Sequence, residues 1–159
     1  MIALLRGRLI NHEDNRGVID VNGVGYEVFA TQGDLLDWSG QEESTVSVST
    51  QVREDSIQLY GFGNEDKRKA FQVLLSVSGV GPKVALATLD TFSASALAAA
   101  IEGDDIRSLN QIPGVGKKTA QRLALELKGK LKVDFVPESK ARTAVKVPSD
   151  PLPLALARL

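Results

Sequence analysis

The sequence LLSVSGVGPKVA, residues Leu74–Ala85, returns 35 positions later as LNQIPGVGKKTA, residues Leu109–Ala120. Six of the twelve positions are identical, including both glycines of a central Gly-Val-Gly, a lysine that follows and an alanine. Each copy has an apolar helical stretch, a short hairpin, and a second helix that begins at or just past the second glycine. This is the helix-hairpin-helix signature, so the sequence predicts a duplicated unit.

The glycines of each hairpin, Gly79 and Gly81 or Gly114 and Gly116, suggest a site for an anion. Glycine adopts dihedrals that other residues avoid, and it allows a ligand to approach the main chain without meeting a Cβ. The start of the second helix has unpaired N–H groups and the positive end of the helix dipole. Positively charged side chains stand just past the second glycine: Lys83, Lys117 and Lys118. The pattern therefore predicts two phosphate-binding hairpins.

Apolar residues at matched positions are expected to support both hairpins. Ala85 and Ala120 allow the two helices of each unit to cross closely, and Val80 and Val115 are expected to enter the apolar core. A lone Gly-x-Gly before a helix could also be a helix cap followed by a turn. Two copies with lysine in register favour backbone-phosphate binding.

A nucleotide cofactor does not fit these hairpins. Both lack the third glycine of a dinucleotide fingerprint, neither follows a strand, and Gln111 stands where a phosphate-binding loop needs glycine. We therefore expect no cofactor.

The composition of the 159 residues indicates an ordinary globular chain, since 43% are apolar. The absence of cysteine excludes disulfides and a cysteine-ligated metal, and it fits a reducing compartment. The amino-terminal apolar run is interrupted by Arg6 and Arg8, so it is too short for a signal sequence or a membrane span. A cytoplasmic protein is expected.

Charge is sorted along the chain, although the net charge is only −1. Residues 1–62 have four Lys/Arg against ten Asp/Glu, whereas residues 63–133 have eleven against seven. The positive segment contains both hairpins, as expected if one region binds phosphates while the other repels them. Chance variation between small domains is the alternative explanation.

The pattern of residues 1–62 predicts five short strands that close into an oligonucleotide-binding (OB) type barrel. The strands are expected around Ile2–Ile10, Val18–Val21, Gly25–Ala30, Val46–Val52 and Ile57–Leu59, with a tight turn at Asn22-Gly23 and a helical turn at Asp34–Trp38. Trp38 is expected to plug the barrel.

Residues 63–133 have a helical period and predict an all-α unit, which gives an α+β fold overall. Asn64 and Ser93 are expected N-caps. The predicted helices are Glu65–Val77, Pro82–Thr91, Ala94–Glu102, Ile106–Gln111 and Lys117–Lys130. Residues 134–159 have no apolar period and are expected to form a flexible linker and the start of a further domain.

Five segments together resemble the RuvA family, the Holliday-junction-binding subunits of the bacterial RuvAB branch migration complex. They are the amino-terminal MI-x-x-L-x-G and the sequences VNGVGYEV (Val21–Val28), VREDSIQLYGF (Val52–Phe62), GVGPK-x-A-L-A (Gly79–Ala87) and PGVGKKTAQRL (Pro113–Leu123). The resemblance covers nearly all of residues 1–132. It implies an OB-type barrel followed by paired hairpins, in agreement with the independent pattern.

The resemblance also implies a non-catalytic homotetramer that holds four-way DNA junctions for recombination, repair and the SOS response to DNA damage. One tetramer or two facing tetramers both fit. Each subunit would hold one duplex arm through its hairpins, without reading sequence. The matching residues are Gly79, Val80, Gly81 and Lys83 in the first hairpin, and Gly114, Val115, Gly116, Lys117, Lys118 and Arg122 in the second.

An acidic pin is a further implication of the resemblance, at Glu54 and Asp55 with Arg53 beside them. Taken alone, this tripeptide is most often a solvated turn. Near a four-fold axis, however, the carboxylates of four subunits would repel crossover phosphates and bar continuous duplex. No metal site is expected here, because adjacent residues on a strand end point to opposite faces.

The family's third domain, which contacts the hexameric motor RuvB, should follow the linker, and only Asp150–Leu159 remains here. We therefore expect this chain to bind junctions without coupling to the motor. The RuvC resolvase is another partner that the resemblance suggests.

Two other classes of function remain open from the residues alone. A generic helix-hairpin-helix module would bind duplex without preferring four-way DNA. A glycosylase or nuclease would need an activated lysine or a carboxylate cluster. The remaining acidic group, Glu102, Asp104 and Asp105, is expected to be a capping and solvated turn. His12 is expected to lie in a polar turn, NHEDN, without ligand companions.

Overall fold

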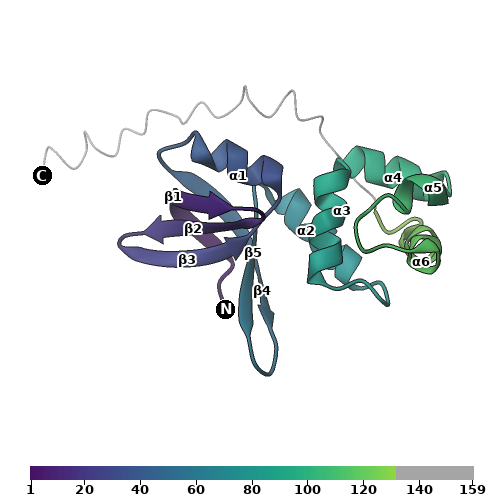
Figure 1. Ribbon diagram of the computed structural model, residues 1–159, viewed down its shortest axis with the longest axis horizontal. Coiled ribbons are helices and arrows are strands. Elements are labelled where there is room, and N and C mark those ends of the chain that lie inside the picture. Colours follow the sequence, from purple (N-terminus) through teal and green to yellow (C-terminus); the bar gives the residue numbers. More distant parts are fainter. Residues whose placement is uncertain (132–159) are drawn as a thin grey trace, which may run out of the picture.

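A closed five-stranded barrel forms the amino-terminal part of the computed structural model, which describes residues 1–131 (Figure 1). The barrel order is β1-β2-β3-β5-β4, antiparallel except where β3 pairs parallel with β5. The strands are β1 (Leu4–Glu13), β2 (Arg16–Val21), β3 (Val24–Phe29), β4 (Ser44–Val52) and β5 (Ile57–Phe62). The predicted OB-type barrel is confirmed, whereas the segment 134–159 lies outside the described residues.

Local sequence explains how the barrel is assembled. Asn22 and Gly23 both have positive φ, 51° and 92°, which is the backbone of the predicted tight turn between β2 and β3. Helix α1 (Gln32–Ser39) covers one end of the barrel, and its Trp38 is 3% exposed within the barrel core. The expectation that Trp38 plugs the barrel is confirmed.

The polar segment around His12 is not a turn, contrary to our expectation. Strand β1 continues through His12, which pairs with Gly17 of β2, and the turn comes later at Asp14 and Asn15. A register irregularity between Leu9 and Asn11 precedes this extension, whose residues Ile10–Glu13 are all exposed. Because both faces of the extension are exposed, its side chains do not alternate between apolar and polar, and the sequence therefore does not indicate a strand there.

Five helices follow the barrel. Helices α3 (Pro82–Thr91) and α4 (Ala94–Glu102) have the predicted bounds, while α2 (Glu65–Leu75), α5 (Ile106–Leu109) and α6 (Lys117–Leu127) end two to three residues earlier than predicted. Two of these early ends have one cause, because the chain tightens into i to i+3 bonds: Val77 N–H donates to Leu74 O, and Ile112 N–H to Leu109 O. Helix α6 ends where Gly129 takes φ 79°.

The barrel and the helices share one continuous apolar boundary. Tyr60 and Phe62 of β5 belong to the core of the helical unit, where both contact Phe71 of α2. Phe29 of β3 stacks on Tyr60 with ring centroids 5.3 Å apart. Only Gly63 and Asn64 separate β5 from α2. The two units are therefore joined by packed aromatic rings as well as by a short connection.

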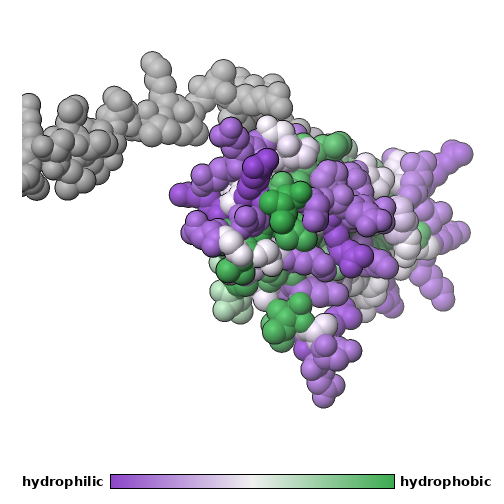
Figure 2. All heavy atoms as spheres, turned by 60° about the vertical axis from the view of Figure 1, so that its left-hand side comes forward, coloured by the Kyte–Doolittle hydropathy of each residue, from purple (hydrophilic) through white to green (hydrophobic). Residues whose placement is uncertain are grey.

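The surface seen from the barrel side is mainly hydrophilic, with separate apolar patches (Figure 2). Large apolar side chains of this region are more than half exposed: Met1, Leu4, Ile10, Val24, Leu36, Val52 and Ile57. Contiguous exposed apolar groups often mark interaction surfaces.

No single helix of residues 1–131 is long and apolar enough to cross a membrane. Helices α3 and α4 have the required length and apolar composition only when taken together, and they are bent by 100° relative to each other.

Candidate nucleic-acid interface

The first hairpin connects α2 to α3 through a turn centred on Gly79. Gly79 has φ +87°, which only glycine adopts without strain, and Val80 N–H donates back to Val77 O at 3.1 Å. Gly81 is the N-cap of α3, with φ −90° and ψ 177°. Val80, 6% exposed, is held in the helical core, as expected.

The second hairpin repeats this geometry 35 residues later. Gly114 has φ +84°, and Val115 N–H donates to Ile112 O at 3.0 Å. Gly116 is the N-cap of α6, with φ −86° and ψ 179°. Val115 is also 6% exposed and lies in the same core. The repeated sequence therefore produces a repeated backbone.

Both hairpins present unpaired backbone donors. The first intrahelical bonds are made by Ala85 to Gly81 O and by Ala120 to Gly116 O, and neither N-cap glycine has a side-chain cap. The N–H groups from each N-cap glycine up to these bonds have no partner within residues 1–131: Gly81, Lys83 and Val84 in the first unit, and Gly116, Lys117, Lys118 and Thr119 in the second. They point to an anion as ligand, because the helix dipole favours negative charge at the same place.

The glycines leave room for that ligand. A Cβ built on Gly79, Gly81 or Gly116 would meet no atom within 4 Å, so the space beside each glycine is open. At Gly114 a Cβ would lie 3.3 Å from Cγ2 of Val84, because α3 packs beside the second hairpin. Three of the four glycines thus border free space into which a phosphate group could come.

Exposed cations surround the hairpins. Lys83, Lys117 and Lys118 are exposed, and none of them forms an ion pair with a carboxylate of the described chain. Arg122 of α6 donates from its Nη1 to the Ser78 hydroxyl, 3.2 Å away. This contact joins the second unit to the loop of the first, so the two hairpins lie close together.

The two hairpins also open onto one cleft between the barrel and the helices. Gly81 and Gly114 both line it, and the barrel contributes Arg16, Arg53 and Tyr60. Burial raises the pKa of Tyr60, and the positive charge of Arg53 opposes this shift. The hairpins are therefore neither buried nor turned to opposite faces.

The acidic tripeptide lies at the turn of the hairpin that β4 and β5 form, which projects from the barrel (Figure 1). Arg53 N–H donates to Ser56 O at 2.8 Å and closes this turn, and Arg53, Glu54 and Asp55 are all exposed. Glu54 and Asp55 lie in the turn itself and not at the end of a strand. Arg53 also lines the cleft that Gly81 and Gly114 line.

The second acidic group is occupied by structural contacts. Asp105 caps α5 by accepting from Ser108 N–H and Oγ, and these bonds hold the pKa of Asp105 below its usual value. Asp104 pairs with Lys128, and Glu102 accepts from Gly129 N–H. The expected capping role is confirmed. Across the described part of the chain no three His, Cys, Asp or Glu side chains are arranged to hold a metal ion.

Sequence patterns missed the barrel's contribution to the cleft. Asn15 lies in the turn between β1 and β2 and Arg16 begins β2, far from either hairpin in sequence. Asp90, near the end of α3, lines the cleft as well. No local signal identifies such residues, because only the folded barrel brings them to the hairpins.

An OB-type barrel followed by two glycine hairpins with free amides defines a tandem helix-hairpin-helix protein. Comparison with known proteins agrees: residues 1–61 match the family model of the RuvA N terminal domain, and residues 71–130 match a SAM-like helix-hairpin-helix tandem.

Three relatives are named Holliday junction branch migration complex subunit RuvA. The protein from Corynebacterium aurimucosum is 46% identical over 94% of this chain and 73% of its own length. That from Thermobifida fusca is 47% identical over 82% of this chain and 65% of its own. The Pelobacter propionicus protein is 49% identical over 88% and 73%. The chain belongs to the RuvA family.

Proposed function

We propose that this chain binds four-way DNA junctions by their shape and without regard to base sequence. The proposal rests on the two hairpins of repeated geometry, which both border one cleft and which have unpaired amides and exposed lysines at the helix that follows each of them. Such groups recognise phosphates, and phosphate contacts position DNA without reading its bases. The relatives' name, which refers to a Holliday junction complex, supports the four-way junction as the form of DNA that is bound.

Each hairpin residue has a defined role in this proposal. The amides around Gly79 and Gly81, and around Gly114 and Gly116, bind phosphate oxygens, while Val80 and Val115 anchor the turns. Positive charge at the bound backbone comes from Lys83, Lys117, Lys118 and Arg122. Residues 63–133 act as the DNA-binding domain, and residues 1–62 as the barrel that presents the acidic turn.

Glu54 and Asp55 act as the selective element, with Arg53 beside them. In a tetramer with four-fold symmetry, the projecting β4–β5 turns would gather at the centre of the junction. Two carboxylates about 4 Å apart repel by about 1 kcal/mol in water, and phosphates are repelled in the same way. Such a centre admits separated strands and disfavours a continuous duplex.

The proposed assembly is a homotetramer, alone or as two facing tetramers. Exposed apolar side chains of the amino-terminal unit, such as Leu36 of α1 and Ile57 of β5, supply surface for contacts between subunits. In this proposal the family's branch migration motor RuvB, and RuvC as a further protein, act on the same junction that this chain binds, and the proposed setting is recombination and repair in the cytoplasm. In this proposal the chain itself carries out no catalysis.

The direct test compares binding to a four-way junction and to linear duplex with the same arm sequences in gel shifts, with light scattering for the mass. We expect tight, sequence-independent binding that favours the junction, and a particle of four or eight subunits. Glu54→Asn with Asp55→Asn should raise affinity for linear duplex relative to the junction. Equal affinity of the parent chain for both DNAs would contradict the proposal and leave a generic duplex-binding module.

A further inference from the structure

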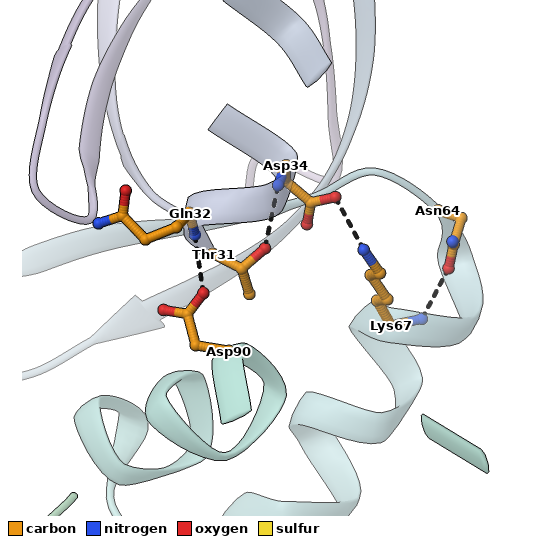
Figure 3. Close-up of polar contacts among 6 residues, drawn as sticks. All are labelled: Thr31, Gln32, Asp34, Asn64, Lys67 and Asp90. Carbon is orange, nitrogen blue, oxygen red and sulfur yellow. Dashed lines mark hydrogen bonds and ion pairs between the residues drawn. The ribbon is translucent and has the colours of Figure 1, made fainter. Parts of the chain in front are cut away.

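Two polar contacts tie the first helix-hairpin-helix unit to the barrel, and both end on the first turn of α1 (Figure 3). One is an ion pair between Lys67 Nζ of α2 and Asp34 Oδ1 of α1, 2.9 Å apart. Its side chains are 27% and 3% exposed, so the carboxylate is buried. A charge removed from water in this way is stable only while its partner remains in place.

The residues around this ion pair leave it little freedom. The backbone N–H of Lys67 donates to Oδ1 of Asn64, 2.8 Å away, so Lys67 also belongs to the capped start of α2. Gly63, the first residue after the barrel, lies directly against the carboxylate: a Cβ there would be 2.6 Å from Asp34 Oδ1. The connection between the two units thus passes over the buried carboxylate.

The second contact is made by Asp90, near the end of α3. Its carboxylate accepts from Gln32 N–H at 2.8 Å and from Asn15 Nδ2 at 2.7 Å. Gln32 is the first residue of α1, where unpaired N–H groups and the dipole favour an anion. Asp90 lies in the last turn of α3, where the helix dipole disfavours a negative charge. Its hydrogen bonds to Gln32 and Asn15 of the barrel unit compensate for this unfavourable position.

These two contacts fix both helices that flank the first hairpin. Helix α2 enters the hairpin, and α3 leaves it at Gly81. Since α3 has ten residues and is about 15 Å long, its start binds the proposed phosphate while its end is fastened to the barrel. Among the residues that the structure describes, α5 and α6 make no polar side-chain contact with the barrel.

We propose that Asp34, Lys67 and Asp90 are positioning residues that hold the first hairpin at a fixed place relative to the acidic turn, and that this fixed place is needed to favour a four-way junction over linear duplex. The inference rests on the proposed function. It separates two properties: the hairpins bind the phosphates of any DNA, whereas the preference for a junction also depends on these contacts.

The test uses spin labels, which the absence of native cysteine makes straightforward. Labels are placed on exposed sites of the barrel and of α4 by Glu42→Cys and Ala99→Cys, and labelled chains are diluted into an excess of unlabelled protein. Distance distributions are measured for the parent, Lys67→Met, Asp90→Ala and their combination. Asp37→Ala is the matched control, because Asp37 is an exposed carboxylate of α1 that makes none of these contacts.

We expect the combined variant to broaden the distance distribution and to lower the junction-to-duplex affinity ratio by about fivefold or more, with duplex affinity no weaker than the parent's. Asp90→Ala, at an exposed position, should show a smaller effect in the same direction even if Lys67→Met impairs folding. A distribution as narrow as the parent's, or an unchanged ratio despite broadening, would overturn the inference and leave the proposed function intact. A parent chain without junction preference would instead refute the proposed function, whatever the distances show.

Discussion

The first hairpin, Val77–Gly81, and the second, Ile112–Gly116, share their backbone dihedrals and their buried valine, yet they differ in charge and in support. The first is followed by Pro82, which has no N–H, and by one lysine. The second is followed by two lysines, and Arg122 lies further along the same helix. The two hairpins thus share their backbone dihedrals but differ in their side chains and by one N–H group.

The structural support of the hairpins differs in the opposite direction from their charge, because the less charged first hairpin is the better supported one. The first hairpin is entered from α2, which has eleven residues and is tied to the barrel through Lys67. The second is entered from α5, which has only four residues and is capped by Asp105. The comparison suggests a division of roles, in which the first hairpin is held in position and the second supplies more of the electrostatic attraction.

Lysine substitutions test this division with the largest expected effect. Lys117→Ala with Lys118→Ala should weaken binding to any DNA by about tenfold per lost contact, and reduce the slope of log affinity against log salt by about two. Lys83→Ala should reduce the slope by about one. Titrations at several salt concentrations measure both, with the exposed Lys69→Ala as control. Equal slopes for the two hairpins would remove the proposed difference in charge.

Alanine substitutions at the two glycines with positive φ test whether the two hairpin turns have the same backbone conformation. Gly79→Ala and Gly114→Ala should each lower the free energy of unfolding by about 1–3 kcal/mol, because alanine is strained at φ near +85°. Gly114→Ala should cost more, since its Cβ also crowds Val84. Urea unfolding measures the difference. A larger loss for Gly79→Ala would mean that the second turn tolerates a Cβ better than its geometry indicates.

Gly81→Ala and Gly116→Ala separate folding from binding. Both positions have φ near −90° and open space around an added Cβ, so stability should change little. Affinity should fall, because the methyl group occupies the place of the approaching phosphate. If these variants bind DNA like the parent chain, the backbone does not make close contact there.

A single amide can be isolated at the start of α6. Lys117→Pro removes the side-chain charge and the N–H, whereas Lys117→Ala removes only the charge. Proline is acceptable at a first helical position, as Pro82 shows in α3. We expect Lys117→Pro to bind about threefold more weakly than Lys117→Ala. Equal affinities would indicate that this amide does not contact phosphate.

The smallest expected effect concerns the short helix α5. Hydrogen bonds from Ser108 hold the pKa of Asp105 below its usual value of about 3.9, so this cap stabilises the fold above that pH. The contribution is lost as the pH falls through the lowered pKa. The protection of the Leu109–Ile112 amides against exchange, relative to their intrinsic exchange rates, should therefore fall at acid pH before that of α2. In Asp105→Asn, whose cap does not titrate, this loss of protection should be absent.

Much of this architecture could be predicted because the signals are local. Pro82 and Ser93 mark the starts of α3 and α4, and Asn22-Gly23 marks the turn between β2 and β3. The ends of α2 and α5 could not be predicted, since each hairpin begins inside an unbroken apolar period. Barrel closure by β3 and β5, and the contacts of Asp34 and Asp90, join residues more than 30 positions apart, and nothing in either segment alone specifies such a partner.

The most direct measurement of the central claim is an amide NMR titration of the isotope-labelled chain with a four-way junction. Phosphate binding by both hairpins predicts that the N–H signals of Gly79, Gly81, Gly114 and Gly116 shift together and saturate at the same DNA concentration. Signals that stay in place at either pair of glycines, while DNA binds elsewhere, would contradict the account.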